Sequence, residues 1–208
     1  MCIRDRKKAI LFSAVACLGM MLAASCGSKN TNEVEVAEAL SVDTVVANPE
    51  AFLGDTVTIE GVVSHLCKHG GKKAFVLGAD ENTMIRCEAT PEMGGAFPQE
   101  SIHKPIRVTG VVVESRIDEE TVKQMEAQHA EQVKMVAEQA GQEQADAVAQ
   151  AATGCETERK AQGQGEIETF EAQMADYRTR IAARAEKEGK PYLSSYYIVA
   201  SAYEILPE

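Results

Sequence analysis

Residues 56–67, TVTIEGVVSHLC, alternate apolar and polar side chains along their length. Because successive side chains of a strand point to opposite faces, this pattern predicts a long β-strand. One face of that strand would carry Val57, Ile59, Val63, His65 and Cys67. A glycine in its middle, Gly61, gives a position at which the strand could bend.

Other segments extend the sheet on both sides of this strand. Strand-like patterns occur at residues 74–78, 83–89, 105–115 and 195–206. The first two flank a polar turn, and the third carries a central glycine, Gly110. A short helix capped by Ser41 is expected over 41–53, and a helical or irregular connector over 91–104.

Three meandering strands, a connector and two further strands, with glycines that bend two of the strands, are typical of a small closed barrel. We therefore predict a mainly β fold with a helical insertion. Its body is a five-stranded OB-like barrel formed by residues 41–118 and 191–208.

Two sequence motifs in this body carry a family resemblance. The stretch GDTVTIEGVV at 54–63, matched by PIRVTGVV at 105–112, resembles the OB-fold lipoproteins of Bacteroidetes-type bacteria. The resemblance covers 41–118 and 191–208 and implies the OB fold. Some members of that group carry a nucleic-acid-binding description inferred from the fold, which does not by itself establish function.

An insertion separates the fourth and fifth expected strands. Residues 119–152 contain one glycine and predict a helix that would be about 50 Å long if it is unbroken, and residues 153–165 form a polar loop. The second helix carries apolar residues at helical spacing: Ile167, Phe170, Met174, Tyr177 and Ile181. Residues 119–190 are thus expected to form a long antiparallel helical hairpin with a coiled-coil seam. Alternatively, that seam docks a protein partner or a second copy of the chain.

The amino-terminal segment has the composition of an export signal. Basic residues at 4–8 precede an apolar run at 9–24, which is too short to span a bilayer comfortably. The following LAASC motif at 22–26 resembles the lipobox of bacterial lipoproteins. It implies a signal peptide at 1–25, a diacylglycerol on Cys26 and a flexible tether at 26–40. The alternative is an ordinary secretory signal with an accidental cysteine.

The residue after the lipidated cysteine bears on localisation. Gram-negative lipoproteins retained in the inner membrane tend to carry Asp there, whereas this chain has Gly27. The resemblance therefore implies a lipid-anchored protein of the cell envelope in the outer membrane. It leaves the face of that membrane open, and we expect the periplasmic side. Its first partner would be the membrane itself, through the lipid on Cys26.

Charge argues against one class of ligand. The formal net charge is −11, and removal of residues 1–25 takes away four basic residues and one acidic residue, which leaves −14. Nucleic-acid binding relies on basic surface that releases counterions from phosphate. DNA and RNA are therefore not the expected ligands.

A possible metal site lies at the end of the first long strand. His65, Cys67 and His69 alternate toward one side, and Cys87 is expected on the same sheet. Imidazole and thiolate ligands suit zinc or copper. Two alternatives remain open, a disulfide between Cys67 and Cys87 or inert side chains.

A further cysteine lies in the expected hairpin loop. If the helices extend outward, Cys155 is far from this cluster and forms an exposed thiol that could cross-link two molecules. A hairpin folded back on the body would instead bring it near the cluster.

Catalytic motifs are absent from the sequence. It contains no GxSxG elbow, P-loop, GxGxxG motif or HExxH motif, so we do not expect an enzyme. The leading hypothesis is a non-enzymatic binding module that presents Phe75, Met84 and Arg86 to a periplasmic ligand. The alternatives are a zinc, copper or thiol-redox protein and an assembly scaffold that uses the hairpin.

Overall fold

The computed structural model describes residues 38–207 except 69 and 81. The chain divides into two units, Met1–Glu35 and Val36–Glu208, and all the described residues belong to the second. The expected signal peptide, the Cys26 lipidation site and most of the expected tether lie outside the described residues.

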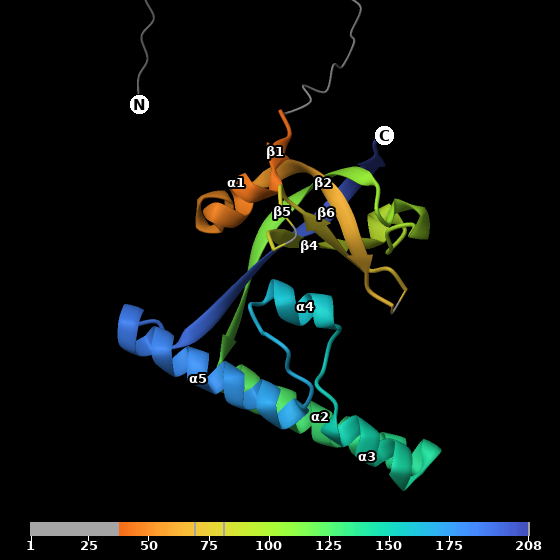
Figure 1. Ribbon diagram of the computed structural model, residues 1–208, viewed down its shortest axis with the longest axis vertical. Helices are drawn as coiled ribbons and strands as arrows, with labels where there is room; N and C mark the ends of the chain where they lie inside the picture. Colours follow the sequence, from red (N-terminus) through yellow and green to blue (C-terminus); the bar gives the residue numbers. More distant parts are fainter. Residues whose placement is uncertain (1–37, 69, 81, 208) are drawn as a thin grey trace, which may run out of the picture. The chain divides into compact units, whose positions relative to one another are not determined.

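A six-stranded mixed sheet forms the body of the described unit (Figure 1). Its strands are β1 (Leu40–Ser41), β2 (Thr56–Leu66), β3 (Lys73–Leu77), β4 (Met84–Ala89), β5 (Pro105–Asp118) and β6 (Tyr192–Ile205). They follow the order β1-β2-β3-β4-β6-β5, with an additional pairing of β2 with β5. The β1–β2 and β4–β6 pairs are parallel, and the other pairs are antiparallel.

The strand β2 forms where the alternating pattern predicted it, but its register changes near its end. A bulge lies between Val63 and His65 in the pairing with β3. Val63 is fully buried, and the next inward side chain is Leu66 rather than His65. A bulge inserts an extra residue, so the simple alternation that placed His65 on the inner face ends at this point.

The glycine of β2 is explained by close packing. A Cβ at Gly61 would collide with the carbonyl oxygen of Leu77 and, at 2.6 Å, with a methyl carbon of Val76. Gly110 in β5 has the same role, because a Cβ there would collide with the backbone of Val199 and Ala200. Both glycines therefore permit neighbouring strands to approach more closely than a side chain would allow.

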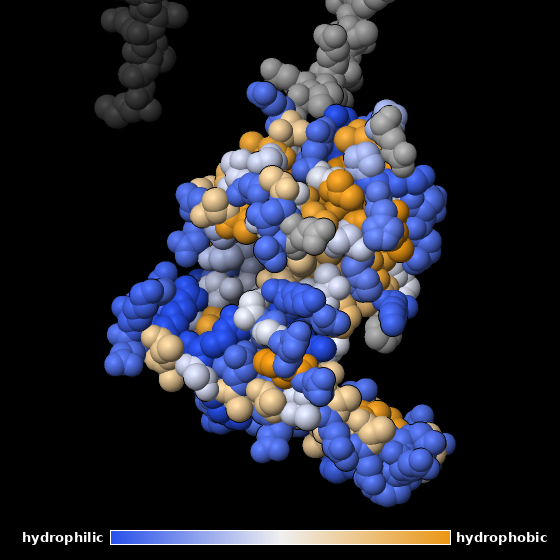
Figure 2. Space-filling model, in the orientation of Figure 1, coloured by the Kyte–Doolittle hydropathy of each residue, from blue (hydrophilic) through white to orange (hydrophobic). Residues whose placement is uncertain are grey.

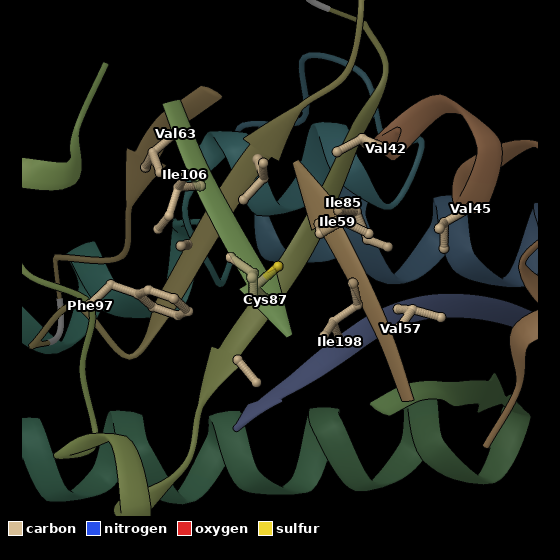
Figure 3. Packing of buried hydrophobic residues seen from close by; sticks show 14 of the residues in the cluster. Val42, Val45, Val57, Ile59, Val63, Ile85, Cys87, Phe97, Ile106 and Ile198 are labelled. Carbon is tan, nitrogen blue, oxygen red and sulfur yellow. The ribbon is translucent and has the colours of Figure 1, made fainter. Parts of the chain in front are cut away.

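The main hydrophobic core lies between the sheet and the first helix, α1 (Val42–Ala47) (Figure 3). Ser41 caps this helix, as the sequence predicted, because its hydroxyl accepts a hydrogen bond from the Thr44 amide at 3.2 Å. The helix stops before Pro49, and a short 3-10 turn, Pro49–Phe52, follows it. Further 3-10 turns, Pro91–Met93 and Gln99–Ser101, lie in the connector before β5.

The two longest strands extend past the rest of the sheet. β5 pairs with β2 only over residues 105–111, whereas its pairing with β6 continues to Asp118, opposite Tyr192. The residues of β5 beyond Val113 pair with β6 alone and thus form a two-stranded ribbon that leads to the helices (Figure 1).

Four helices occupy the connection between β5 and β6. They are α2 (Glu119–Ala140), α3 (Gln142–Gln150), α4 (Glu156–Ala161) and α5 (Phe170–Glu188). Gly141, with φ of 96°, separates α2 from α3, so the helix expected over residues 119–152 is broken at its one glycine. A second, smaller core joins this segment to the ribbon. It contains Ile117, Val122, Met174, Tyr177 and Ile181.

The predicted fold class is therefore wrong in its specific form. The described residues form a six-stranded mixed sheet of uneven strands rather than an evenly closed five-stranded barrel. They contain no long antiparallel hairpin, because Gly141 interrupts the first helix and α4 occupies the expected loop. The coarser prediction of a mainly β body is partly consistent with the structure. The hypothesis of an assembly scaffold assumed a long helical hairpin, and the described residues do not form one.

Candidate functional site

The short helix α4 lies against the sheet rather than at the end of an extended hairpin (Figure 1). Its sequence explains its formation: Gly154 and Gly163 on either side have positive φ angles, and Glu156 and Lys160 form an ion pair one turn apart at 2.7 Å. Cys155 caps the helix, because its Sγ accepts a hydrogen bond from the Glu158 amide at 3.4 Å.

One carboxylate attaches α4 to the sheet. Glu158 Oε1 accepts hydrogen bonds from Lys73 Nζ of β3 at 2.6 Å and from Arg86 Nη1 of β4 at 2.9 Å. The Glu158 and Arg86 side chains are only 13% and 11% exposed. The Arg86 guanidinium also lies over the Tyr197 ring, 4.3 Å from its centroid. Ion pairs that are shielded from solvent in this way are stronger than pairs on an open surface.

Polar contacts attach the same segment to α5. Gln173, which is 3% exposed, accepts a hydrogen bond from the Thr153 amide at 2.8 Å and donates one to its carbonyl at 3.1 Å. On the other side of α4, the Gln162 side chain accepts a hydrogen bond from Tyr177 at 2.8 Å, and Arg180 donates to the Gln162 carbonyl at 2.8 Å. The segment that carries α4 is therefore held between the sheet and α5.

A cavity of about 630 Å³ opens between α4 and the turn that joins β2 to β3. Its lining combines thiols with side chains of both charges: Cys67, Lys68, Lys72, Lys73, Gly154, Cys155, Glu156 and Glu158. Small-molecule sites commonly have volumes of about 300–1,000 Å³. The cavity is therefore large enough for a small ligand.

The charges around this cavity do not cancel. Glu158 is bonded to Lys73 and Arg86, and Glu156 is bonded to Lys160. Within the described part of the chain, Lys68 and Lys72 have no ion-pair partner. Two ammonium groups are thus available to a ligand in a chain whose formal net charge is −11. On the face shown in Figure 2, hydrophilic side chains gather over α4, and apolar patches lie over the sheet.

The turn beside the cavity has a defined conformation. Gly70 and Gly71 have φ angles of 80° and 66°, a left-handed conformation that glycine adopts readily. The Gly71 amide donates to the Cys67 carbonyl at 3.0 Å, and the Cys67 amide donates to the Lys73 carbonyl at 2.9 Å. These hydrogen bonds hold Cys67 at the cavity, directly opposite the residue that binds Glu158.

Three of the four residues of the expected metal site, His65, Cys67 and Cys87, are among the described residues, and these three do not form a group that could hold a metal ion. Cys87 is fully buried in the main core, where burial raises the pKa of its thiol to about 12. The His65 ring contacts Phe75, and its Nε2 is buried without a hydrogen-bond partner among the described residues. His69 lies outside those residues. In the part of the chain that is described, no group of three His, Cys, Asp or Glu side chains is placed to hold a metal ion.

The positions of the cysteines agree with two of the alternatives left open by the sequence: Cys87 is buried in the core, as an inert side chain would be, and Cys155 lies near Cys67, as a segment folded back on the body would place it. Cys87 is a free thiol, so the disulfide with Cys67 considered from the sequence is not formed. Cys155, which the outward hairpin would have placed far away, lines the same cavity as Cys67. The charge order of residues 156–160 could have indicated a short helix, but no sequence pattern indicated that it packs on the sheet.

The expected ligand face is largely covered. Phe75 is fully buried, and Arg86 lies beneath α4. Met84 is half-buried and lines a smaller hollow of about 160 Å³ beside the end of α4. The face of β3 and β4 is thus occupied by the protein's own helix. Separately, among the residues described here, none of the helices is both long enough and apolar enough to cross a membrane.

Comparisons with known proteins give little further information. No family model matches the chain, and no curated protein matches it. Among solved structures, the chain is similar to one from Leishmania major Friedlin described as "a putative aspartyl-tRNA synthetase". The similarity has a TM-score of 0.26 and 17% identity, and it covers 42% of this chain and 18% of that one. A likeness of this size carries no argument about fold or function.

Proposed function

We propose that this chain is a non-enzymatic binding protein of the cell envelope, and that its ligand is a small anion held in the cavity beside α4. The observation that carries the proposal is the pair of ammonium groups, Lys68 and Lys72, that line a cavity of about 630 Å³ without an ion pair among the described residues.

Electrostatics supports an anionic ligand. Lysine side chains in a partly enclosed space attract carboxylate or phosphate groups, because a cleft concentrates the field of its charges. The ammonium groups are strong hydrogen-bond donors, and the cavity acidic groups are already engaged by Lys73, Arg86 and Lys160. The overall acidity of the chain still disfavours a long polyanion such as DNA or RNA. A small anion is consistent both with the two lysines of the cavity and with the net negative charge of the chain.

A titration of the full chain with pyrophosphate and with citrate tests this proposal. We expect saturable calorimetric binding that weakens as salt is added, since ion pairs at an open cavity are screened. The double variant Lys68→Gln/Lys72→Gln should weaken binding about tenfold or more, which corresponds to about 1.4 kcal/mol.

A matched control separates a site from general charge. Lys123→Gln/Lys187→Gln removes the same charge from exposed positions on α2 and α5 and should leave the affinity unchanged. Equal losses in the two double variants, or no binding of either anion by the parent chain, would contradict the proposal.

The envelope location is a separate part of the proposal and is supported by the amino-terminal sequence. The order of basic, apolar and small residues before Cys26 is the basis for the proposed lipid anchor. Cells that express the chain and are fed a clickable palmitate analogue should label it. The variant Cys26→Ala should lose the label, whereas Cys155→Ala should keep it. Labelling that survives in Cys26→Ala would contradict the anchor.

A further inference from the structure

Two cysteines far apart in the sequence meet at one cavity. Cys67 follows β2, and Cys155 precedes α4, yet both line the same space, and both are half-buried. Cys87 differs from them, because it is fully buried in the core and its thiol pKa is raised by that burial. Reagents in solution can therefore reach the first two thiols, but not the third in the folded state.

A chain of short contacts connects the two segments that carry these thiols. The Cys67 amide bonds to the Lys73 carbonyl at 2.9 Å, and the Lys73 ammonium bonds to Glu158 at 2.6 Å. The Glu158 amide in turn bonds to the sulfur of Cys155 at 3.4 Å. The helix that Cys155 caps is therefore bonded to the strand residue that lies opposite Cys67.

The backbone next to Cys155 can adjust. Gly154 has a φ of 77°, and a side chain built there would meet only the carboxylate of Glu158, at 3.6 Å. A glycine directly before a cysteine gives the freedom that disulfide geometry requires, because a disulfide demands closely spaced Cβ atoms.

We propose that Cys67 and Cys155 form a reversible intramolecular disulfide that links α4 to the β2–β3 turn. This inference goes beyond the proposed function and does not depend on the identity of the cavity's ligand. The cross-link would hold the helix over the sheet by a covalent bond, in addition to the ion pairs of Glu158.

The reaction is a thiol–disulfide exchange with a low-molecular-weight or protein disulfide as oxidant. The thiolate of one cysteine attacks a sulfur of the oxidant, forms a mixed disulfide and releases one thiolate, which takes up a proton. The second cysteine then attacks the protein sulfur of the mixed disulfide, forms the Cys67–Cys155 bond and releases the second thiol. The two protein thiols lose two electrons and two protons, and the oxidant gains both.

The disulfide would also change the cavity. The new bond would lie in the space that both thiols line, and it would join the two segments that bound this space. Oxidation would thus narrow the cavity and restrict the motion of α4. The cavity that binds the ligand would therefore also be the cavity that oxidation of its two cysteines narrows.

Peptide mapping of the full chain tests the inference. The chain is incubated with excess oxidised glutathione, the remaining thiols are alkylated, and the protein is digested with trypsin without reduction. Cys67, Cys87 and Cys155 fall in separate tryptic peptides, 30–68, 87–107 and 135–159. We expect a species that joins 30–68 to 135–159 and disappears on treatment with dithiothreitol.

Single cysteine-to-serine variants identify which two cysteines are joined. Cys87→Ser should keep the cross-link, whereas Cys67→Ser and Cys155→Ser should each abolish it and leave glutathione on the remaining cysteine. Serine at 155 still offers an oxygen that can cap α4, so this variant keeps the local fold. The oxidised parent should migrate as a monomer on a non-reducing gel.

Other outcomes overturn the proposal. Separate glutathione adducts on Cys67 and Cys155 in the parent chain would show that the thiols cannot meet. A link from either cysteine to Cys87, or a cross-linked dimer, would show a different pairing. Complete alkylation of both cysteines after oxidation would show that no disulfide forms. None of these readouts depends on anion binding, so failure here is distinguishable from failure of the proposed function.

Discussion

The sheet and the helical segment are stabilised in different ways. Sixteen buried residues from α1, the strands and the connector form the main core, whereas five form the core that joins the helices to the ribbon. The helical segment adds ion pairs and buried amides, such as Arg178 with Glu126 at 2.8 Å and Gln173 with Thr153. Apolar burial therefore dominates in the sheet, and polar contacts contribute a larger share between β5 and β6.

The largest expected loss of stability comes from a cavity created in the main core. Ile59 is fully buried, so Ile59→Ala should lower the free energy of unfolding by about 2–5 kcal/mol through lost burial and the void left behind. Urea denaturation followed by circular dichroism measures this change. Hydrogen exchange should show faster exchange throughout the sheet.

Met174→Ala is the counterpart in the smaller core. It should speed amide exchange in α2 and α5 while the sheet amides keep their protection. Equal loss of protection in the sheet for both variants would show that the two regions unfold as one unit and would remove the distinction drawn above.

An intermediate loss of stability is expected at the contact between the sheet and the helical segment. Glu158→Gln removes the carboxylate that neutralises Lys73 and Arg86, and it should cost about 1–3 kcal/mol because Arg86 stays largely shielded. The amides of α4 should exchange faster, as measured by mass spectrometry of peptides from 151–169.

Glu156→Gln serves as the matched control on the same helix. Glu156 is exposed and, among the described residues, forms an ion pair with Lys160 alone, so loss of this exposed pair should speed the exchange of α4 much less than Glu158→Gln does. If both variants release α4 equally, the Glu158 contacts do not hold the helix on the sheet.

The smallest expected effect is the pH dependence of stability that Cys87 contributes, which is absent at neutral pH. Burial raises the pKa of its thiol from an ordinary value of 9.0 to about 12, so the folded state holds this proton more tightly than the unfolded state does. The resulting stability is fully present below pH 9 and is lost as the pH rises from 9 toward 12. At pH 10 the loss is about 1 kcal/mol.

Comparison of the parent chain with Cys87→Ala isolates this contribution. The difference in unfolding free energy between the two should be constant below pH 8 and should shrink between pH 9 and 11. A constant difference over the whole range would mean that the thiol titrates normally in the folded chain.

The strands were predictable because their cause is local. Alternation at residues 56–67 and the apolar runs at 74–78, 83–89 and 105–115 each mark a strand that the structure contains. The glycine within β2 was noted as a bend, and the structure shows that it permits close packing with β3. Two-residue β1 left no pattern to recognise, because Leu40 and Ser41 are too few to alternate.

Most of the candidate site could not be predicted, because it depends on a change of strand register and on contacts between residues far apart in the sequence. The bulge after Val63 ended the alternation on which the His65, Cys67 and His69 grouping depended. The packing of α4 follows from Glu158 meeting Lys73 and Arg86, which lie 85 and 72 residues away in the sequence. Among the members of the expected metal cluster that the structure describes, Cys67 alone lines the cavity now proposed as the site.

The β5–β6 ribbon also determines how the helical segment is connected. Asp118 and Tyr192 are partners in the ribbon, so residues 119–191 leave and re-enter the sheet at adjacent positions. In topological terms the whole helical segment is the loop of one β-hairpin. Its length can therefore change during evolution without altering the pairing of any other strand, and the entropy of closing it rises only slowly as residues are added.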